Sequence, residues 1–91
     1  MYTPLQYELH QNYPNPFNPA TTIRFSLPEA GNVKLTLFNI LGQEIRTLVN
    51  EYRESGVHTI NFEANNLKSG MYIYKIEAGS FKQSRKMILV K

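Results

Sequence analysis

Apolar and polar residues alternate with a period of two along most of the chain. Ile23, Phe25 and Leu27 are separated by polar residues, and the same alternation recurs in several later segments of the chain. Because successive side chains of a strand point to opposite faces of a sheet, this pattern is typical of half-buried strands. It predicts seven strands, at residues 6–11, 21–27, 33–40, 44–52, 57–63, 71–78 and 81–90.

Turn-forming residues separate these strands. Pro28 and Gly31 bracket the first turn, and Gly42, Gly56 and Gly79 occur in later turns. Proline fixes one backbone dihedral and glycine permits unusual ones, so both residues favour turns. Seven short strands spaced in this way predict an all-β fold, a seven-stranded immunoglobulin-like antiparallel β-sandwich.

Two segments depart from simple alternation. In residues 44–53 the apolar side chains also fit helical spacing, but β-branched Thr47 and Val49 favour a strand. Residues 86–91 include a continuously apolar run, which we expect to be covered on both faces. The predicted core consists of Phe17, Ile23, Phe25, Leu35, Leu37, Ile60, Phe62, Tyr72, Tyr74, Ile76 and Ile88.

All five prolines lie within residues 4–28, and three of them fall at near-alternate positions in residues 14–19. Each proline pushes the residue before it into extended conformation. We therefore expect a stiff extended lead-in rather than a helix or a central strand. Asn15, Pro16 and Phe17 form its predicted structural motif, in which Phe17 docks on the core and fixes the segment.

Composition excludes most catalytic chemistry. The chain has 91 residues, which is enough for one domain with a thin core and no deep cleft. It contains no cysteine, so it has no disulfide, thiol nucleophile or thiolate metal site. His10 and His58 are far apart and lack zinc-ligand spacing, and we expect His58 to be a partly buried strand residue. We predict no catalytic residue, no metal and no cofactor.

The charges are distributed unevenly. Residues 1–67 carry four basic residues against six Glu, a net charge of −2, whereas residues 68–91 carry six basic residues against one Glu, a net charge of +5. This excess is either a solvated face of two strands or a recognition surface for an acidic partner. Nucleic acid is not an expected partner, because the aromatic residues occupy inward strand positions instead of alternating with exposed basic residues.

Gly70 and Tyr72 begin the predicted penultimate strand. In immunoglobulin-like sandwiches, a tyrosine at this place returns its hydroxyl to the backbone a few residues upstream. A glycine two residues earlier supplies the permissive backbone of such a corner. The alternative is an ordinary turn glycine before an aromatic strand, and both interpretations are structural.

Four segments together resemble the C-terminal sorting domain of the type IX (Por) secretion system. The similarity extends over about residues 7–91, and the NYPNPF stretch within the first of the four segments is its most distinctive part. The segments are QNYPNPFNP at residues 11–19, TTIRFSLP at 21–28, GMY at 70–72 and SRKMILVK at 84–91.

The resemblance implies an immunoglobulin-like, non-catalytic signal domain that directs a secreted cargo across the outer membrane. It implies four partners: the outer-membrane translocon, its shuttle protein, a surface sortase-like peptidase and a cargo domain fused at the N-terminal side. It implies passage through the periplasm, then secretion or attachment at the cell surface. The recognition residues that it implies lie in the last strands, namely Gly70, Tyr72, Lys86, Met87 and Lys91.

The resemblance also divides the chain. Residues 7–91 form the sorting domain, and residues 1–6 belong to a linker or were added outside the domain. Residues 1–11 lack the basic start and apolar core of a signal peptide, so we expect that peptide elsewhere on the precursor.

A structural or carbohydrate-binding immunoglobulin-like accessory module of a secreted enzyme is the alternative. A sugar-binding module needs solvent-facing aromatic residues grouped on one flat surface. Only Tyr52 and Phe38 are expected to face outward, and they are far apart. The position in the precursor discriminates the two classes, because a sorting domain ends its precursor and an accessory module can be followed by further chain.

Overall fold

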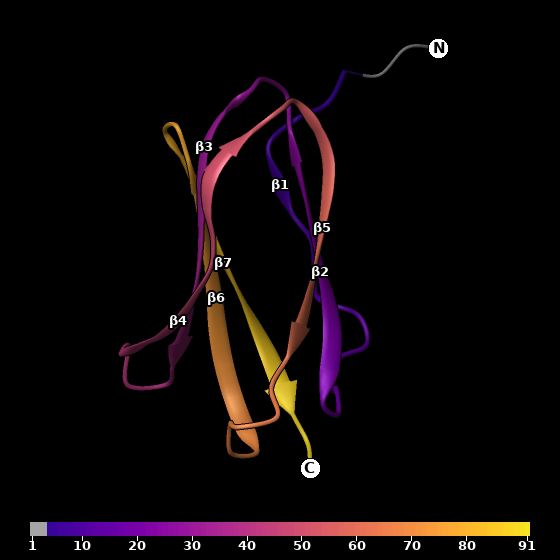
Figure 1. The fold of residues 1–91 in the computed structure, drawn as a ribbon, viewed down its shortest axis with the longest axis vertical. Helices are drawn as coiled ribbons and strands as arrows, with labels where there is room; N and C mark the ends of the chain where they lie inside the picture. Colours follow the sequence, from indigo (N-terminus) through magenta and orange to yellow (C-terminus); the bar gives the residue numbers. More distant parts are fainter. Residues whose placement is uncertain (1–3) are drawn as a thin grey trace.

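The computed structural model describes residues 4–91, so residues 1–3 of the expected linker lie outside the described residues. The chain forms two antiparallel sheets with strand orders β1-β2-β5 and β4-β3-β6-β7, packed face to face (Figure 1). This arrangement confirms the seven-stranded all-β sandwich. The strands are β1 (Glu8–Leu9), β2 (Ala20–Leu27), β3 (Gly31–Asn39), β4 (Glu44–Arg53), β5 (Gly56–Glu63), β6 (Gly70–Ala78) and β7 (Phe81–Leu89).

The core lies between the inner faces of the two sheets. Of the residues predicted for it, Ile60 is only partly buried against the core, and Ile88 is not in the core at all. The other nine are buried, so the alternation of apolar residues identified the inward faces of the first strands correctly. The buried hydrophobic residues are Leu9, Phe17, Ile23, Phe25, Leu27, Val33, Leu35, Leu37, Val49, Phe62, Ala64, Tyr72, Tyr74, Ile76, Ala78, Met87 and Leu89.

β7 has one buried face and one exposed face. Met87 is 0% exposed and Leu89 is 1% exposed, whereas Ile88 is 39% exposed and Val90 is 49% exposed. The predictions that this run is covered on both faces and that Ile88 belongs to the core were therefore wrong. A continuously apolar run does not reveal which alternate residues point inward. Pairing with β6 decides this, because Met87 lies opposite the inward-facing Tyr72.

β4 is a strand, as the β-branched residues indicated. Its pairing with β3 contains two register shifts, between Leu35 and Thr36 and between Leu37 and Phe38. At these shifts Leu48 and Ile45 have no partner in the register. A bulge adds one residue to a strand and breaks its alternation, which explains why the apolar residues of β4 fall at helix-like spacing.

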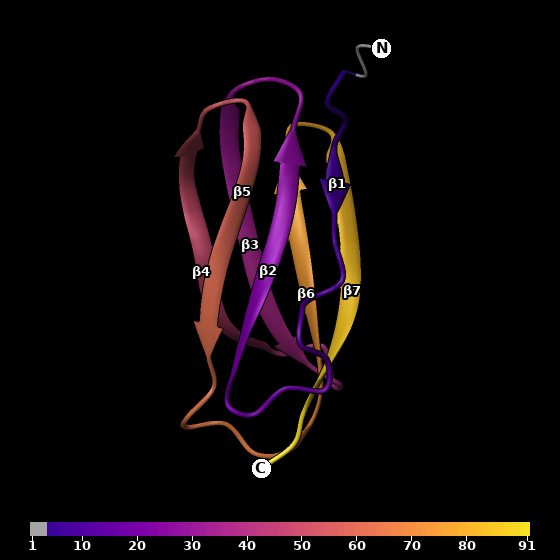
Figure 2. The ribbon, with the colours of Figure 1, turned by 90° about the vertical axis from the view of Figure 1, so that its right-hand side faces the viewer.

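The lead-in segment covers the outer edge of β7, as Figure 2 shows beside the yellow strand. The backbone N–H of Phe17 donates to the carbonyl oxygen of Ile88 at 2.9 Å, and that of Val90 donates to the Phe17 carbonyl at 3.0 Å. The Asn15 side-chain oxygen accepts a bond from the Ile88 N–H at 2.9 Å. Phe17 is itself buried, which confirms its predicted docking. β1 is shorter than predicted, although His10 and Tyr13 remain hydrogen-bonded to Arg24 and Thr22 of β2 before the chain reaches this edge.

The start of the lead-in is attached to the core through Tyr74. The Tyr74 hydroxyl donates to the His10 carbonyl at 2.7 Å and accepts from the Asn12 N–H at 2.8 Å. Burial raises the pKa of Tyr74 to about 12. The buried Asn12 side chain in turn donates to the Thr21 hydroxyl at 3.0 Å and to the Pro14 carbonyl at 3.1 Å. The segment is therefore hydrogen-bonded to both sheets.

We expect Tyr74→Phe to lower the free energy of unfolding by about 2 kcal/mol, because it leaves a buried donor and acceptor without partners. The unfolded chain loses this proton near a pKa of 10.0 and the folded chain near 12, so the contribution of Tyr74 is complete below 10 and is lost as pH rises through 12. Urea denaturation at neutral and alkaline pH measures both effects. Tyr52→Phe, at an exposed position, is the control and should change neither.

Candidate functional site

The corner before β6 has the geometry expected from the sequence. The Tyr72 hydroxyl donates to the carbonyl oxygen of Lys68 at 2.7 Å. Gly70 has a backbone φ of 151°, a conformation that residues with a side chain rarely adopt. The tyrosine corner is thus confirmed, and it fixes the path by which the chain enters β6.

The last residue is attached to the same corner. The Lys91 N–H donates to the Ser69 hydroxyl at 3.0 Å, and its ammonium group donates to the Asn65 carbonyl at 2.7 Å. Ser69 directly precedes β6 and Asn65 follows β5, so residue 91 lies against the connection between these strands (Figure 1). The corner and the chain end, which are remote in sequence, form one region.

Two of the five predicted recognition residues are buried and three are exposed. Tyr72 and Met87 lie opposite each other and are buried in the core, so their side chains shape the strands from within. Gly70, Lys86 and Lys91 are exposed. Lys86 lies opposite Ile73 on the outer face. The lysines are therefore the members of this set whose side chains a partner can contact.

The predicted structural motif lies beside those residues. Asn15 and Phe17 bind the backbone of β7 at Ile88, and the Gln11 side chain donates to the Lys86 carbonyl at 2.6 Å. The segment with the distinctive prolines and the last strand were predicted separately. The structure brings them together along one edge.

Part of the basic excess is used by the fold. The Arg85 Nε donates to the carbonyl oxygen of Leu9, so its charge is turned toward β1. The Lys75 ammonium lies over the Phe38 ring, 5.7 Å from its centroid. Lys82 is exposed on β7 like Lys86. Lys75, Lys82 and Lys86 therefore lie on the outer face of β6 and β7, where Glu77 lies opposite Lys82.

Sequence reasoning missed Tyr13, whose side chain is 81% exposed. It was overlooked because it lies outside the alternating strands, between Asn12 and Pro14 in the lead-in. Tyr52 is exposed as expected, and Phe38 is half-buried. Tyr13 borders a shallow depression of about 350 Å³ on the three-stranded sheet, which also includes Arg24. One exposed ring in a polar depression lacks the grouped aromatic surface that a sugar-binding module requires.

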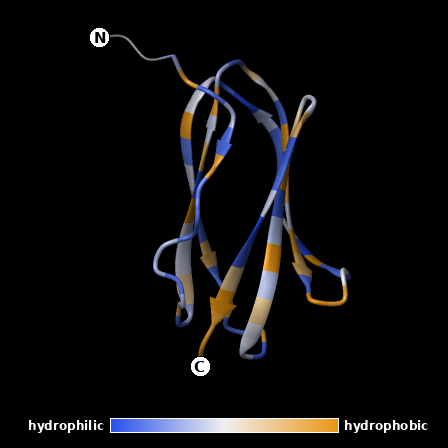
Figure 3. Cartoon of the chain, turned by 180° about the vertical axis from the view of Figure 1, so that it is seen from behind, coloured by the Kyte–Doolittle hydropathy of each residue, from blue (hydrophilic) through white to orange (hydrophobic). Residues whose placement is uncertain are grey.

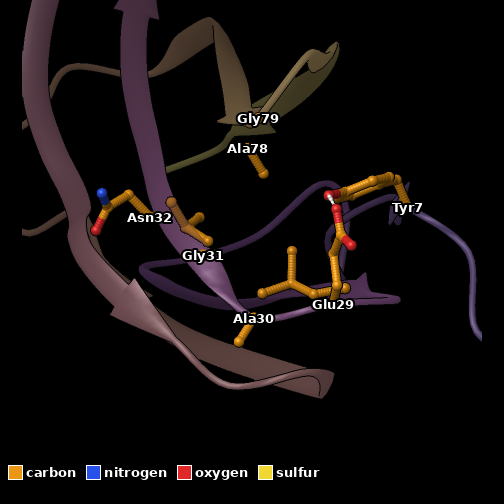
Figure 4. Close-up of a pocket in the computed structure, with 9 residues that line it drawn as sticks. Tyr7, Glu29, Ala30, Gly31, Asn32, Ala78 and Gly79 are labelled. Carbon is orange, nitrogen blue, oxygen red and sulfur yellow. Dashed lines mark hydrogen bonds between the residues drawn. The ribbon is translucent and has the colours of Figure 1, made fainter.

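A second depression, of about 240 Å³, lies where the chain enters the sandwich (Figure 4). The Tyr7 hydroxyl donates to the Glu29 carboxylate at 3.4 Å, and much of the remaining lining is small or aliphatic.

Across residues 4–91, no group of three potential metal ligands is present and no helix is long and apolar enough to span a membrane. His58 is half-buried in β5, as expected.

These observations define a small all-β domain in which the predicted recognition residues and the proline-rich segment meet at the last strand. The family model of the secretion system C-terminal sorting domain matches residues 11–91. The chain belongs to this family, which confirms the resemblance found in the sequence.

The protein is thus a type IX secretion C-terminal sorting domain, a non-catalytic domain that serves as the secretion signal for its cargo. Membership implies that the cargo is secreted or held at the cell surface, and that the domain interacts with the secretion machinery. No curated protein and no solved structure matches the chain. The family match favours export over the accessory-module alternative.

We expect Tyr72→Phe to lower the free energy of unfolding by about 1–2 kcal/mol, because the Lys68 carbonyl loses its donor. Gly70→Ala should cost about 1 kcal/mol because of the positive φ. Gly31→Ala is the matched control, since Gly31 has open space around its α-carbon and no positive φ. Denaturant midpoints measure all three, and equal midpoints would show that the corner does not stabilise the domain.

Proposed function

We propose that this domain delivers its cargo to the type IX outer-membrane translocon and its shuttle protein, and that residues 70–91 form the recognised element. The family match to residues 11–91 carries this proposal. The packing of the lead-in segment on β7 supports it, because the family's distinctive segment stabilises the strand that we expect to be read. The domain then acts as a folded signal.

The proposal assigns contact with the machinery to Lys86 and Lys91. Both side chains are exposed, and they lie in the part of the chain where the net charge is +5. A surface of this sign accelerates encounter with an acidic partner. Gly70, Tyr72 and Met87 contribute by holding the strands in the recognised shape.

We further propose that residues 7–91 are the sorting unit and that residues 1–6 connect it to the cargo. Tyr7 supports this boundary, because its ring stacks on Phe81 with centroids 5.1 Å apart, whereas residues 4–6 are exposed and precede β1. In this account the precursor crosses the inner membrane by a signal peptide, and the domain is read in the periplasm. A surface sortase-like peptidase then cuts on the N-terminal side of the sorting unit.

A reporter fusion tests the function directly. Residues 7–91 are fused to the C-terminal side of a periplasmic reporter that carries its own signal peptide, in a host with a type IX system. The expected result is reporter activity outside the cell or on its surface. The same reporter without the domain should stay in the periplasm, and retention of both proteins would contradict the proposal.

We expect Lys86→Ala with Lys91→Ala to leave the fusion folded but in the periplasm. The substitutions should change stability by about 0.5 kcal/mol, because both side chains are exposed. Cell fractionation measures export, and the denaturation midpoint of the purified domain verifies folding.

Arg24→Ala with Lys34→Ala is the matched control, since both residues are exposed on other strands and carry the same total charge. Arg46 is unsuitable for a control because its guanidinium lies 5.3 Å from the centroid of the Phe62 ring. Equal export of the two double variants would show that the lysines are a solvated face.

A further inference from the structure

Apolar side chains gather on the outer face of the four-stranded sheet, at the end where β6 begins and β7 ends. Met71 lies opposite Ile88, and Ile73 lies opposite Phe38. Residues directly opposite each other in an antiparallel pair point to the same face. Phe38, Met71, Ile73 and Ile88 therefore form one cluster across β3, β6 and β7, here called the outer apolar patch.

The outer apolar patch is accessible. Met71 is 42% exposed and Ile88 is 39% exposed, while Phe38 and Ile73 are half-buried. Ile40, which follows β3 in the hairpin before β4, is 69% exposed. The end of β7 and part of this hairpin are coloured orange in Figure 3.

The far half of this face carries mainly charged residues, with Tyr52 opposite Asn32 as its exposed aromatic residue. Lys34 lies opposite Glu77, and Glu77 lies opposite Lys82, so the far half of the face carries a row of charges. A solvated sheet face normally carries polar residues throughout. An apolar cluster confined to one end of such a face, rimmed by polar residues, marks a contact site.

The charges beside the patch indicate the chemistry of the partner. Lys86 lies opposite Ile73, and the Lys75 ammonium lies over the ring of Phe38. Both cations border the apolar residues on the β6–β7 side. A complementary surface would place apolar groups on the patch and carboxylates against the two lysines.

The covered edge of β7 restricts how a partner docks. An exposed edge strand can bind another chain by adding a strand to the sheet. Here the backbone of Phe17 and the side chain of Asn15 already occupy the Ile88 backbone groups on that edge. A partner that binds this end of the domain therefore reads side chains on the outer face.

We propose that the outer apolar patch, together with Lys75 and Lys86, is a docking surface for a protein of the export machinery that presents an apolar centre flanked by carboxylates. The inference rests on the proposed function and specifies the face through which it operates. A second copy of the domain would present the same two lysines to the patch, and like charges would oppose that pairing.

The reporter fusion carrying Met71→Thr and Ile88→Thr tests the patch. Threonine has the β-branched shape that strands favour, and it lacks most of the apolar surface of methionine and isoleucine. Export should fall by about tenfold, the scale expected when two half-exposed apolar side chains no longer contribute to an interface. The denaturation midpoint of the purified domain should stay close to that of the unmodified chain.

Tyr52→Thr with Val57→Thr is the control, because both residues are exposed apolar positions on β4 and β5, away from the patch. This variant should be exported normally. Equal export of the patch variant and the control would overturn the inference and leave the proposed function intact. Failure of the unmodified fusion to be exported would instead contradict the proposed function.

The acidic character of the partner is tested at the two lysines. Lys75→Glu with Lys86→Glu should reduce export more than Lys75→Ala with Lys86→Ala, because reversal adds repulsion to the lost attraction. Equal effects of the two pairs would overturn the assignment of carboxylates to the partner.

Two further measurements test whether a second copy of the domain or a lipid surface, rather than another protein, occupies the patch. The purified chain is sedimented over a range of concentrations and mixed with phosphatidylglycerol vesicles. The expected results are a monomer and no vesicle binding. Self-association or vesicle binding that disappears in the Met71→Thr, Ile88→Thr variant would overturn the proposal in favour of a second copy or a lipid surface.

Discussion

The attachment of the lead-in segment to β7 is the interaction on which the rest of the structure depends. β7 is an edge strand of the four-stranded sheet, and an unprotected edge is open to pairing with other chains. Phe17 closes it with two backbone hydrogen bonds while its ring enters the core beside Phe62, with centroids 6.2 Å apart. Asn15 reaches across 73 residues of sequence to the N–H of Ile88. The two ends of the domain therefore stabilise each other.

The register of β7 with β6 and the attachment of the lead-in segment together determine how a partner can contact the last strand. Met87 and Leu89 fill the core, so Lys86 and Ile88 must face outward. Because the edge is covered beside Ile88, the recognition that we propose there uses the outer face rather than strand addition. The accessible surface of β7 forms in its final shape only when residues far apart in sequence have met, so the surface that we propose to be recognised belongs to the folded domain.

Sequence reasoning succeeded where a residue's role follows from its immediate neighbours. Alternation identified the strands, the flanking prolines identified Phe17 as a docked residue, and the Gly70–Tyr72 spacing identified the corner. It failed where the role depends on a partner strand. The orientation of Ile88 is set by its register with β6, and the helix-like spacing in β4 arises from bulges against β3. The exposure of Tyr13 depends on how the lead-in pairs with β2 at Thr22.

The same dependence explains why the candidate site was only partly visible in the sequence. A surface assembled from Phe38, Met71 and Ile88 draws on three strands, and its members become neighbours only through the registers of β3, β6 and β7. Motif reading instead selected contiguous residues, and so it grouped buried Met87 with exposed Lys86. The structure separates these two roles, since a change at Met87 acts through the stability of the sandwich and a change at Lys86 acts on the surface that it presents.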